Sequence, residues 1–283
     1  MHIPDGFLTP PVWGTLDAIS APAVAWVARR AQRETQDRRI PLLGVMGAFV
    51  FAAQMINFPV GPGTSGHLVG GALLSIVLGP AAAALVMTAI LALQALIFQD
   101  GGVLALGANI FNMALMGVAA GFLPYRLWSS TNRSAAIFAA GAFSVMTSAC
   151  LALGQLLISG VPMGGKVLWA SLALFLVSAL MEGAITIAAV RAIERLNPEW
   201  AAGAPQPSSS RALAGLALAV LALVVVGTLI ASSAPDGIQR LIGQDTPAGP
   251  VWSLKVIDGI GGLILIFVLC FLGGKAISRR RSA

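Results

Sequence analysis

Charged side chains are scarce in this sequence of 283 residues. Asp, Glu, Lys and Arg make up 10% of it, whereas 57% of the residues are hydrophobic. A typical soluble domain carries about 25% charged residues and lacks the long uncharged runs found here. With a mean hydropathy of +0.87, the chain cannot fold as a water-soluble globule. We therefore predict an all-α polytopic membrane protein.

Cysteine and histidine are nearly absent. Cys150 and Cys270 lie in apolar runs without CxxC spacing, which argues against a disulfide framework and against a thiolate metal site. His2 and His67 are the only histidines. The sequence pI near 10.4 does not indicate a nucleic-acid partner, because the basic residues lie between hydrophobic runs rather than on one soluble face. This distribution instead indicates that the chain is surrounded by membrane lipid.

Nine apolar segments predict nine membrane spans. A full helical crossing needs about 20 residues, so the third segment, which begins at His67, is too short to cross unaided. We expect it to be tilted, partly re-entrant or supported by its neighbours. The predicted spans are residues 12–28, 42–57, 67–78, 81–98, 103–123, 135–158, 167–192, 212–231 and 253–273.

Basic residues are distributed unevenly between the two sides of these spans. If the chain starts outside, all but three of the 17 Lys and Arg residues fall on one side, the exceptions being Lys166, Arg240 and Lys255. Loops rich in Lys and Arg stay in the cytoplasm. We therefore expect Met1 and the loop before His67 on the outer face, and the carboxyl terminus in the cytoplasm.

Segment 197–210, NPEWAAGAPQPSSS, interrupts the hydrophobic pattern. It is rich in Pro, Ser and Ala, which is typical of a linker, and the topology places it in the cytoplasm. It divides a seven-span domain, residues 1–196, from a two-span module, residues 211–283. At the start of the chain we expect no signal peptide, because prolines interrupt any apolar core there and no basic residue opens the sequence.

The first two residues offer an unusual set of nitrogen ligands. The amine of Met1, the amide nitrogen of His2 and Nδ1 of its ring can close fused chelate rings around one ion. The amide must lose its proton, which Ni(II) and Cu(II) promote in a planar field of nitrogens. His67 can supply the fourth nitrogen, and the bulk of His2 favours retention of Met1. The alternative is that His2 has no metal role and that His67 only caps the short third segment.

Three stretches of the sequence resemble one family of membrane proteins. MHIPDGFL at residues 1–8, INFPVGPGTSGHLVGGALLSIVLGP at 56–80 and DGGVLALGANIFNMALMG at 100–117 are similar to the CbiM/NikM family. Its members are the substrate-specific (S) subunits of energy-coupling factor transporters for cobalt and nickel, and the resemblance covers residues 1–195. The two-span module is similar to the small CbiN/NikN component, whose PDGLE loop appears here as PDGIQ at residues 235–239.

The resemblance implies metal binding by Met1, His2 and His67. The transported substrate is then Ni(II), with Co(II) as the alternative because the family serves both ions. It also implies a transmembrane coupling (T) protein, cytoplasmic ATPase subunits and a place in the bacterial inner membrane. We expect no enzyme and no ATPase site in this chain, because the loop-like stretch GVPMGGKV has Val167 where a phosphate-binding loop needs Ser or Thr.

Five polar residues are candidates for supporting the metal site. Asp5 can accept backbone N–H groups in a tight turn, or offset the charge of the ion. Thr64 and Ser65 can fix the nearby histidine ring, with an ordinary flexible loop as the alternative. Asn109 and Asn112 share one face of a predicted helix, where they can hydrogen-bond the amino terminus or pair between helices.

Small residues and one buried acid point to further roles inside the membrane. Gly44, Ala48 and Ala52 recur every four residues, and such residues allow close helix contact, either with a coupling subunit or within the chain. Glu182 lies within a predicted span, where an ionisable group is costly. We expect it to have a structural or coupling role and to lie too far from the outer face to bind the metal. It is also the deep acid that an autonomous secondary permease, the alternative from another class, would use.

Overall fold

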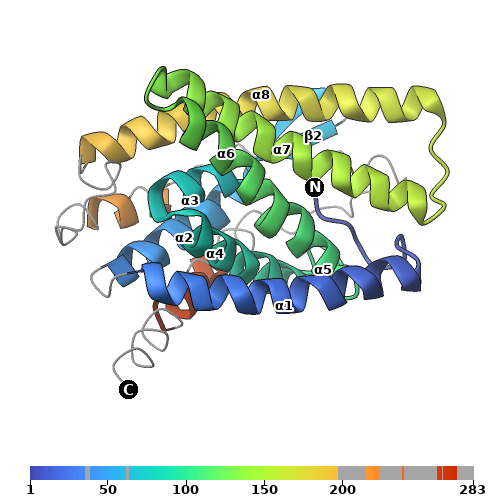
Figure 1. The fold of residues 1–283 in the computed structure, drawn as a ribbon, viewed down its shortest axis with the longest axis horizontal. Coiled ribbons are helices and arrows are strands. Elements are labelled where there is room, and N and C mark those ends of the chain that lie inside the picture. Colours follow the sequence, from blue (N-terminus) through green and yellow to red (C-terminus); the bar gives the residue numbers. More distant parts are fainter. Residues whose placement is uncertain are drawn as a thin grey trace.

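Long helices form most of the molecule (Figure 1). The computed structural model describes residues 1–35, 39–61 and 64–196, together with 214–218, 220–222, 238, 260–262 and 264–272 nearer the carboxyl end. The π-helical stretches η2 and η3 continue α4 and join α5 to α6. The elements are α1 (Pro10–Glu34), α2 (Ile40–Gln54), β1 (Asn57–Gly61), β2 (Thr64–His67), α3 (Gly71–Leu78), α4 (Pro80–Leu93), η2 (Gln94–Phe98), α5 (Leu106–Asn109), η3 (Ile110–Gly117), α6 (Val118–Trp128), α7 (Arg133–Ile158) and α8 (Gly165–Leu196).

Four helical stretches in the described part of the chain are long and apolar enough to cross a membrane. They coincide with four of the predicted spans and confirm a multi-pass, all-α membrane protein. A fifth predicted span appears as the shorter apolar helix α2. The linker 197–210 and the PDGIQ loop, Ile238 excepted, lie outside the described residues. The four stretches are Pro80–Phe98, Leu106–Trp128, Arg133–Ile158 and Gly165–Arg195.

The prediction for the first span was wrong at its carboxyl end. α1 continues through the first three arginines of the basic run, which we expected to follow the helix, and ends at Glu34. Its polar residues contact the bundle: the amide of Gly107 donates to Asp17 Oδ1 at 2.8 Å, and Ser20 Oγ donates to the Gly107 carbonyl at 2.7 Å. Asp17 is therefore paired inside the protein, at the start of the helical stretch that begins with α5.

The third predicted segment begins too early, because His67 is the last residue of a β-hairpin and the short helix α3 begins only at Gly71. β1 and β2 pair antiparallel, with Asn57 opposite His67. The helix that follows, α3, has eight residues and begins after Gly70, whose φ of 77° lies in the left-handed region that favours glycine. His67 thus ends a strand, and a short turn separates it from α3.

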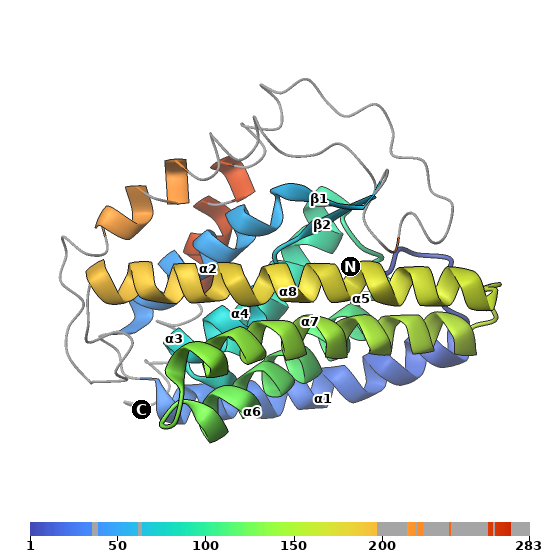
Figure 2. The same cartoon turned by 90° about the horizontal axis from the view of Figure 1, so that it is seen from above.

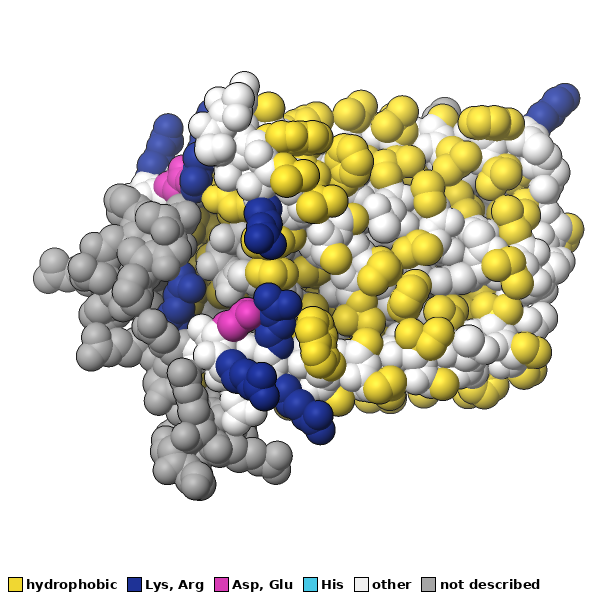
Figure 3. Space-filling view, in the orientation of Figure 1, with side chains coloured by type: hydrophobic (Ala, Val, Ile, Leu, Met, Phe, Trp, Pro, Cys, Tyr) yellow, Lys and Arg dark blue, Asp and Glu magenta, His cyan; other side chains and the backbone are white. Residues whose placement is uncertain are grey.

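Helices α7 and α8 lie side by side along the molecule in both views (Figures 1 and 2). Glycines allow their close approach, since a Cβ atom added at Gly141 would lie 2.8 Å from the Cα atom of Gly183. Figure 3 shows a broad band of hydrophobic side chains, with Lys and Arg side chains concentrated toward one end of the molecule. The basic asymmetry of the sequence is therefore visible in three dimensions, while the orientation in the membrane stays a prediction.

The small-residue face of α2 packs within the chain. A Cβ atom added at Gly44 would lie 2.9 Å from the ring of Phe267, in the carboxyl-terminal helix. Ala48 and Ala52 are 2% and 0% exposed. The structure therefore supports the intramolecular alternative for Gly44, Ala48 and Ala52, because residues of the same chain cover the face that we had considered for a coupling subunit.

Candidate metal centre

The amino-terminal segment is buried inside the helical bundle. Met1, His2 and Ile3 are 8%, 4% and 0% exposed. The mark for the amino terminus lies within the outline of the bundle in both views (Figures 1 and 2). A chain end with a charged amine is costly to bury unless its polar groups have partners. The role of this segment therefore depends on which groups its polar atoms contact.

Ile3 is fixed by hydrogen bonds to its main chain. Its amide donates to Asn109 Oδ1 at 2.9 Å, and the Asn109 amide group donates back to the Ile3 carbonyl at 3.1 Å. The amide of Gly102 donates to the same carbonyl at 2.9 Å. Asn109 thus holds the amino-terminal segment, which is one of the two roles considered for it. Its side chain pairs with this segment much as a neighbouring strand would.

Asp5 caps the helical stretch that begins at α5. Its carboxylate accepts backbone N–H groups from Val103 at 3.0 Å, Leu104 at 2.8 Å and Ala105 at 3.2 Å. Amides at a helix start lack partners within the helix, and the helix dipole favours a negative charge there. Asp5 therefore ties the amino-terminal segment to the bundle, and its carboxylate is turned toward these amides.

Replacing Asp5 with Ala is expected to destabilise the protein by about 1–2 kcal/mol, the usual cost of losing a helix cap. Asp5→Asn is the matched control, because asparagine keeps an acceptor oxygen and caps nearly as well. Thermal unfolding of the purified protein in detergent measures both. Equal unfolding temperatures for wild type and Asp5→Ala would contradict the capping role.

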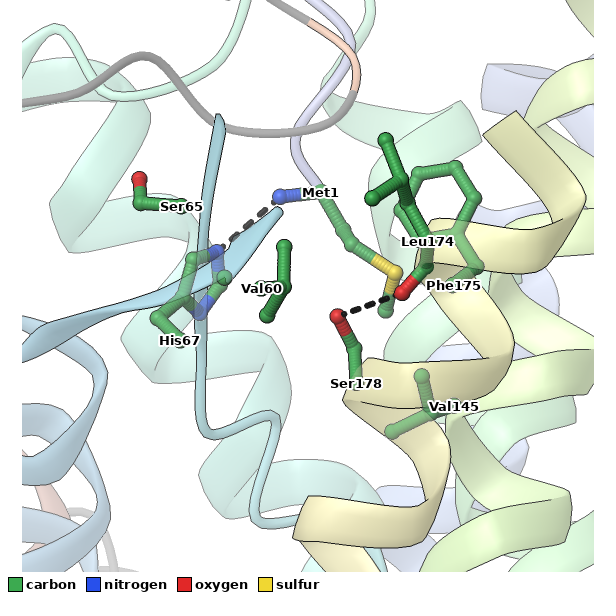
Figure 4. A pocket seen from close by; sticks show the side chains of 9 residues that line it. Met1, Val60, Ser65, His67, Val145, Leu174, Phe175 and Ser178 are labelled. Atoms are coloured by element: carbon green, nitrogen blue, oxygen red, sulfur yellow. Dashed lines mark hydrogen bonds between the residues drawn. The ribbon is translucent and has the colours of Figure 1, made fainter. Parts of the chain in front are cut away.

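Met1 and His67 meet through their nitrogens. The amine of Met1 lies 3.0 Å from His67 Nε2 (Figure 4). The other ring nitrogen, Nδ1, lies 2.9 Å from the Leu68 carbonyl. A carbonyl only accepts hydrogen bonds, so Nδ1 carries the proton and Nε2 presents its lone pair to Met1. The sequence-distant histidine is therefore in the tautomer that a metal ligand requires.

His2 lies against both His67 and an acidic residue. The two imidazole rings are stacked, with centroids 5.4 Å apart and planes 9° from parallel. His2 Nδ1 lies 3.2 Å from Asp100 Oδ1, so in this arrangement Nδ1 donates a proton to the carboxylate. Nε2 of the same ring is buried without a hydrogen-bond partner among the described residues. His2 thus contacts both the His67 ring and the Asp100 carboxylate.

Asp100 is a site residue that we did not single out from the sequence. It opens the motif DGGVLALGANIFNMALMG, and its position in that motif was the available signal. Its side chain is 46% exposed. Desolvation raises the pKa of this carboxyl, but its interactions with His2, including the hydrogen bond, and with His67 and the amino terminus lower it by more, so the pKa lies below the usual range. Asp100 is therefore ionised and gives the site a negative group that faces solvent.

The geometry of these groups fits part of a planar nitrogen site. With metal–nitrogen bonds of about 2 Å, neighbouring corners of a square lie about 2.8 Å apart, close to the 3.0 Å between Met1 N and His67 Nε2. The pocket lined by Met1 and His67 leaves about 10 Å³, roughly the room for one water-sized particle. His2 Nδ1 faces Asp100, so it must turn from the carboxylate to join the same ion.

Side-chain clusters do not explain a metal site here. Within the residues that the structure describes, no three His, Cys, Asp or Glu side chains gather to hold an ion. The donor set that the sequence predicts includes main-chain nitrogens as well as imidazoles, and it stays a prediction.

Glu182 contacts the chain directly after His67. Its two carboxylate oxygens accept hydrogen bonds from the amides of Val69 and Gly70, both at 2.8 Å. This is a structural contact, which is one of the two roles that we expected for Glu182. The carboxylate therefore supports the buried residues between β2 and α3, and the expectation that it does not bind the metal itself stays a prediction.

The remaining candidates divide between the site and the bundle. Ser65 is buried and lines the pocket of Met1 and His67 (Figure 4), but a main-chain carbonyl takes the place at His67 Nδ1 that we expected for a hydroxyl. The side chain of Thr64 lies outside the described residues. Asn112 pairs with Gln155 of α7 through two hydrogen bonds of 2.8 and 2.6 Å, which is the interhelical alternative.

Comparison with protein families matches residues 2–200 to the family described as the cobalt uptake substrate-specific transmembrane region, CbiM. A putative metal transport protein of Haloquadratum walsbyi is 48% identical over 155 residues, which are 54% of this chain and 71% of the relative. A putative fused nickel transport protein NikMN of Archaeoglobus fulgidus is 38% identical over 253 residues, 87% of this chain and 80% of the relative. The similarity thus reaches beyond the seven-span region.

Two solved structures have a similar fold. One, a transition metal transporter, is 30% identical with a TM-score of 0.64 and covers 70% of this chain and 95% of its own. The other, a truncated transition metal transporter, is 31% identical with a TM-score of 0.63 and covers 69% of this chain and 99% of its own. About 70% of the chain therefore shares its fold with proteins described as transition metal transporters.

Proposed function

The chain belongs to the CbiM family of cobalt uptake substrate-specific transmembrane regions, and from this premise we propose that it captures Ni(II) as the substrate of an ATP-driven importer. As a member of that family it is a multi-pass membrane protein of metal uptake. In the proposal, Met1, His2 and His67 bind the ion. Residues 1–196 form the metal-binding domain, and residues 211–283, beyond the linker 197–210, assist metal loading.

The contact between Met1 N and His67 Nε2 is the observation that carries the proposal. These atoms belong to residues 66 positions apart and lie 3.0 Å from each other in a partly buried place. An amine and an imidazole lone pair are both good ligands for Ni(II). The amide nitrogen and Nδ1 of His2 complete the square once the amide has lost its proton. The four donors then come from the amino-terminal segment and from His67 at the end of β2, which the fold brings together.

Asp100 is suited to a role in the approach of the ion. Its carboxylate is ionised and half exposed, and it touches His2 Nδ1 at 3.2 Å. A negative group at the mouth of a site raises the local concentration of cations. In the proposal, Asp100 attracts the hydrated ion. The ring proton of His2 then moves from Nδ1 to Nε2, which has no hydrogen-bond partner among the described residues, so that Nδ1 can bind the metal in place of its contact with Asp100.

Nickel fits a planar nitrogen site better than cobalt does. Affinities for a given nitrogen site rise from Co(II) to Ni(II), and planar geometry is typical of Ni(II) and Cu(II). Co(II) remains the alternative substrate. The family name refers to cobalt, whereas a relative is named as a nickel transport protein. A comparison of Ni(II) and Co(II) binding therefore decides between the two substrates.

Isothermal titration of the purified chain is expected to give an affinity for Ni(II) at least about tenfold higher than for Co(II). His2→Ala removes the imidazole donor and shortens the chelate, so nickel binding should weaken by about a hundredfold or more, as expected for losing a direct ligand. Equal affinities for both ions would favour the cobalt alternative. Unchanged nickel binding by His2→Ala would remove His2 from the proposed site.

The proposed partners are a transmembrane coupling protein and cytoplasmic ATPase subunits in the bacterial inner membrane. The proposal places the amino terminus outside and the carboxyl terminus in the cytoplasm, and it rests on the basic end of the molecule (Figure 3). The alternative is an autonomous secondary permease. That reading loses its main support, since the carboxylate of Glu182 is engaged by two backbone amides instead of lining an open route.

Vesicles that contain this chain alone are expected to bind Ni(II) but to accumulate little of it. Vesicles that also contain the coupling protein and the ATPase subunits should accumulate the ion in an ATP-dependent way. Radioactive ⁶³Ni counted after filtration measures both, with a vesicle lacking all subunits as the blank. Rapid accumulation by the chain alone would favour the permease.

A further inference from the structure

Glu182 is an acidic residue buried in the apolar stretch Gly165–Arg195, where its side chain is 1% exposed. A carboxylate inside a membrane protein is costly unless its oxygens are satisfied, and such residues usually have a function. Both oxygens of Glu182 are satisfied by the amides of Val69 and Gly70, each at 2.8 Å. These amides precede α3, whose free N–H groups and dipole favour a negative charge at this end.

The main chain of Val69 is held on its other side as well. Gln54 Nε2 donates to the Val69 carbonyl at 2.7 Å, and Gln94 Nε2 donates to Gln54 Oε1 at 2.7 Å. The peptide groups of Val69 are therefore clamped between α8 on one side and α2 on the other. The residues of this clamp are buried, with exposed fractions of 0% to 4% for Val69, Gln54, Gln94 and Glu182.

Leu68 and Val69 connect this clamp to His67, the candidate metal ligand. Val69 follows Leu68, and the Leu68 carbonyl lies 2.9 Å from His67 Nδ1, which sets the tautomer and the direction of the ring. The opposite nitrogen, Nε2, lies 3.0 Å from the amine of Met1. Phe175 and Ser178, on the same helix as Glu182, line the pocket beside Met1 and His67 (Figure 4).

We propose that Glu182 is the positioning residue of the metal site, which holds the chain after His67 so that Nε2 points at Met1. This inference rests on the proposed function, because it assigns a role in nickel binding. In this proposal the affinity for the ion also depends on the position of α8, which carries Glu182. Both hydrogen bonds of Glu182 join α8 to the chain before α3, so the position of His67 depends on that of α8.

Glu182→Gln tests the inference, because the side chain keeps its size but offers one acceptor oxygen to two N–H groups. Titration is expected to show nickel affinity lowered by about 10- to 100-fold, the usual effect of losing a group that orients a ligand. The absorption band of planar nickel should also weaken at equal metal concentration. Wild-type affinity with an unchanged band would overturn the role of Glu182.

Gln155→Leu is the matched control, since it removes another buried polar contact, that with Asn112, away from the metal loop. It should lower the thermal stability of the protein while leaving nickel affinity within about threefold, since it changes no group that orients a ligand. An equal loss of affinity in both variants would mean that bundle stability, and not positioning, sets the affinity.

Two further variants keep the outcomes distinguishable. If Glu182→Gln does not yield folded protein, Glu182→Asp keeps the charge but is shorter by one methylene, so it should bind nickel less tightly than wild type; wild-type affinity would overturn the inference. His67→Ala serves as the reference for the site itself. If His67→Ala loses binding while Glu182→Gln does not, the positioning role is wrong and the nickel site stands; unchanged binding in both would overturn the proposed function as well.

Discussion

Two residues, Gly-Ser, added before Met1 are expected to abolish tight nickel binding while the protein stays folded. The extension turns the amine of Met1 into an amide and moves the new amine out of reach of His67 Nε2, to which the present amine lies at 3.0 Å. We expect affinity to fall by at least about a hundredfold, more than for an outer-shell change.

The length of the extension matters. A single added residue would place the histidine third in the chain, where an amine, two amides and the imidazole can form a planar chelate without His67. Two added residues avoid that arrangement. The control carries the same two residues after Ala283, and mass spectrometry verifies the amino terminus of each protein. Nickel titration and thermal unfolding measure the effects; tight binding by the amino-terminal extension would remove the amine from the site.

His67→Ala is expected to have the second large effect. It removes the nitrogen that closes the square and leaves a three-nitrogen chelate formed by Met1 and His2. Nickel should still bind weakly, with affinity lower by about a hundredfold or more, because a direct ligand is worth more than a group that only orients one. The planar absorption band should change as water takes the fourth position. Titration and absorption spectra of the same sample measure both.

Cys150→Ala is a suitable control for that experiment. Cys150 is a free, exposed cysteine on α7, and a thiol is a competing ligand for nickel in any titration. The control should bind nickel as the wild type does. If His67→Ala binds as tightly as the control, the long-range contact between Met1 and His67 has no part in capture, and the hairpin has another purpose.

The sequence predicted the parts of the site that depend on local chemistry. The chelate proposed for Met1 and His2 uses neighbouring atoms, so no knowledge of the fold was needed to propose it. The family resemblance, which the comparisons confirm, named His67 as their partner. The spans 81–98, 135–158 and 167–192 were also close to the observed helices, because long uncharged runs are a strong signal in a membrane protein.

The contacts of Asp100 and Glu182 could not be predicted, because they depend on which segments the fold brings together. Asp100 lies 98 residues from His2 and Glu182 lies 113 residues from Val69 in the sequence. The hairpin of β1 and β2 was missed because its strands are short and contain Pro and Gly, which weaken any strand pattern. The apolar residues after it then suggested one continuous span.

Asn109 and Asn112 illustrate a smaller error. Their spacing of three residues predicts a shared face on a regular α-helix. In the structure the π-helical stretch η3 begins between them, at Ile110. Asn109 then reaches Ile3 and Asn112 reaches Gln155 on α7. A change of helix type, which residue spacing does not reveal, separates two side chains that the sequence placed together.

Nickel K-edge X-ray absorption of the loaded full-length protein tests the central claim most directly. The account predicts a four-coordinate planar ion surrounded by nitrogen, with a diamagnetic centre in the same sample, because low-spin planar Ni(II) has no unpaired electrons. The signal should be lost in the protein extended before Met1. A six-coordinate, paramagnetic ion with mainly oxygen neighbours would contradict the account, since Met1, His2 and His67 would then not enclose the metal.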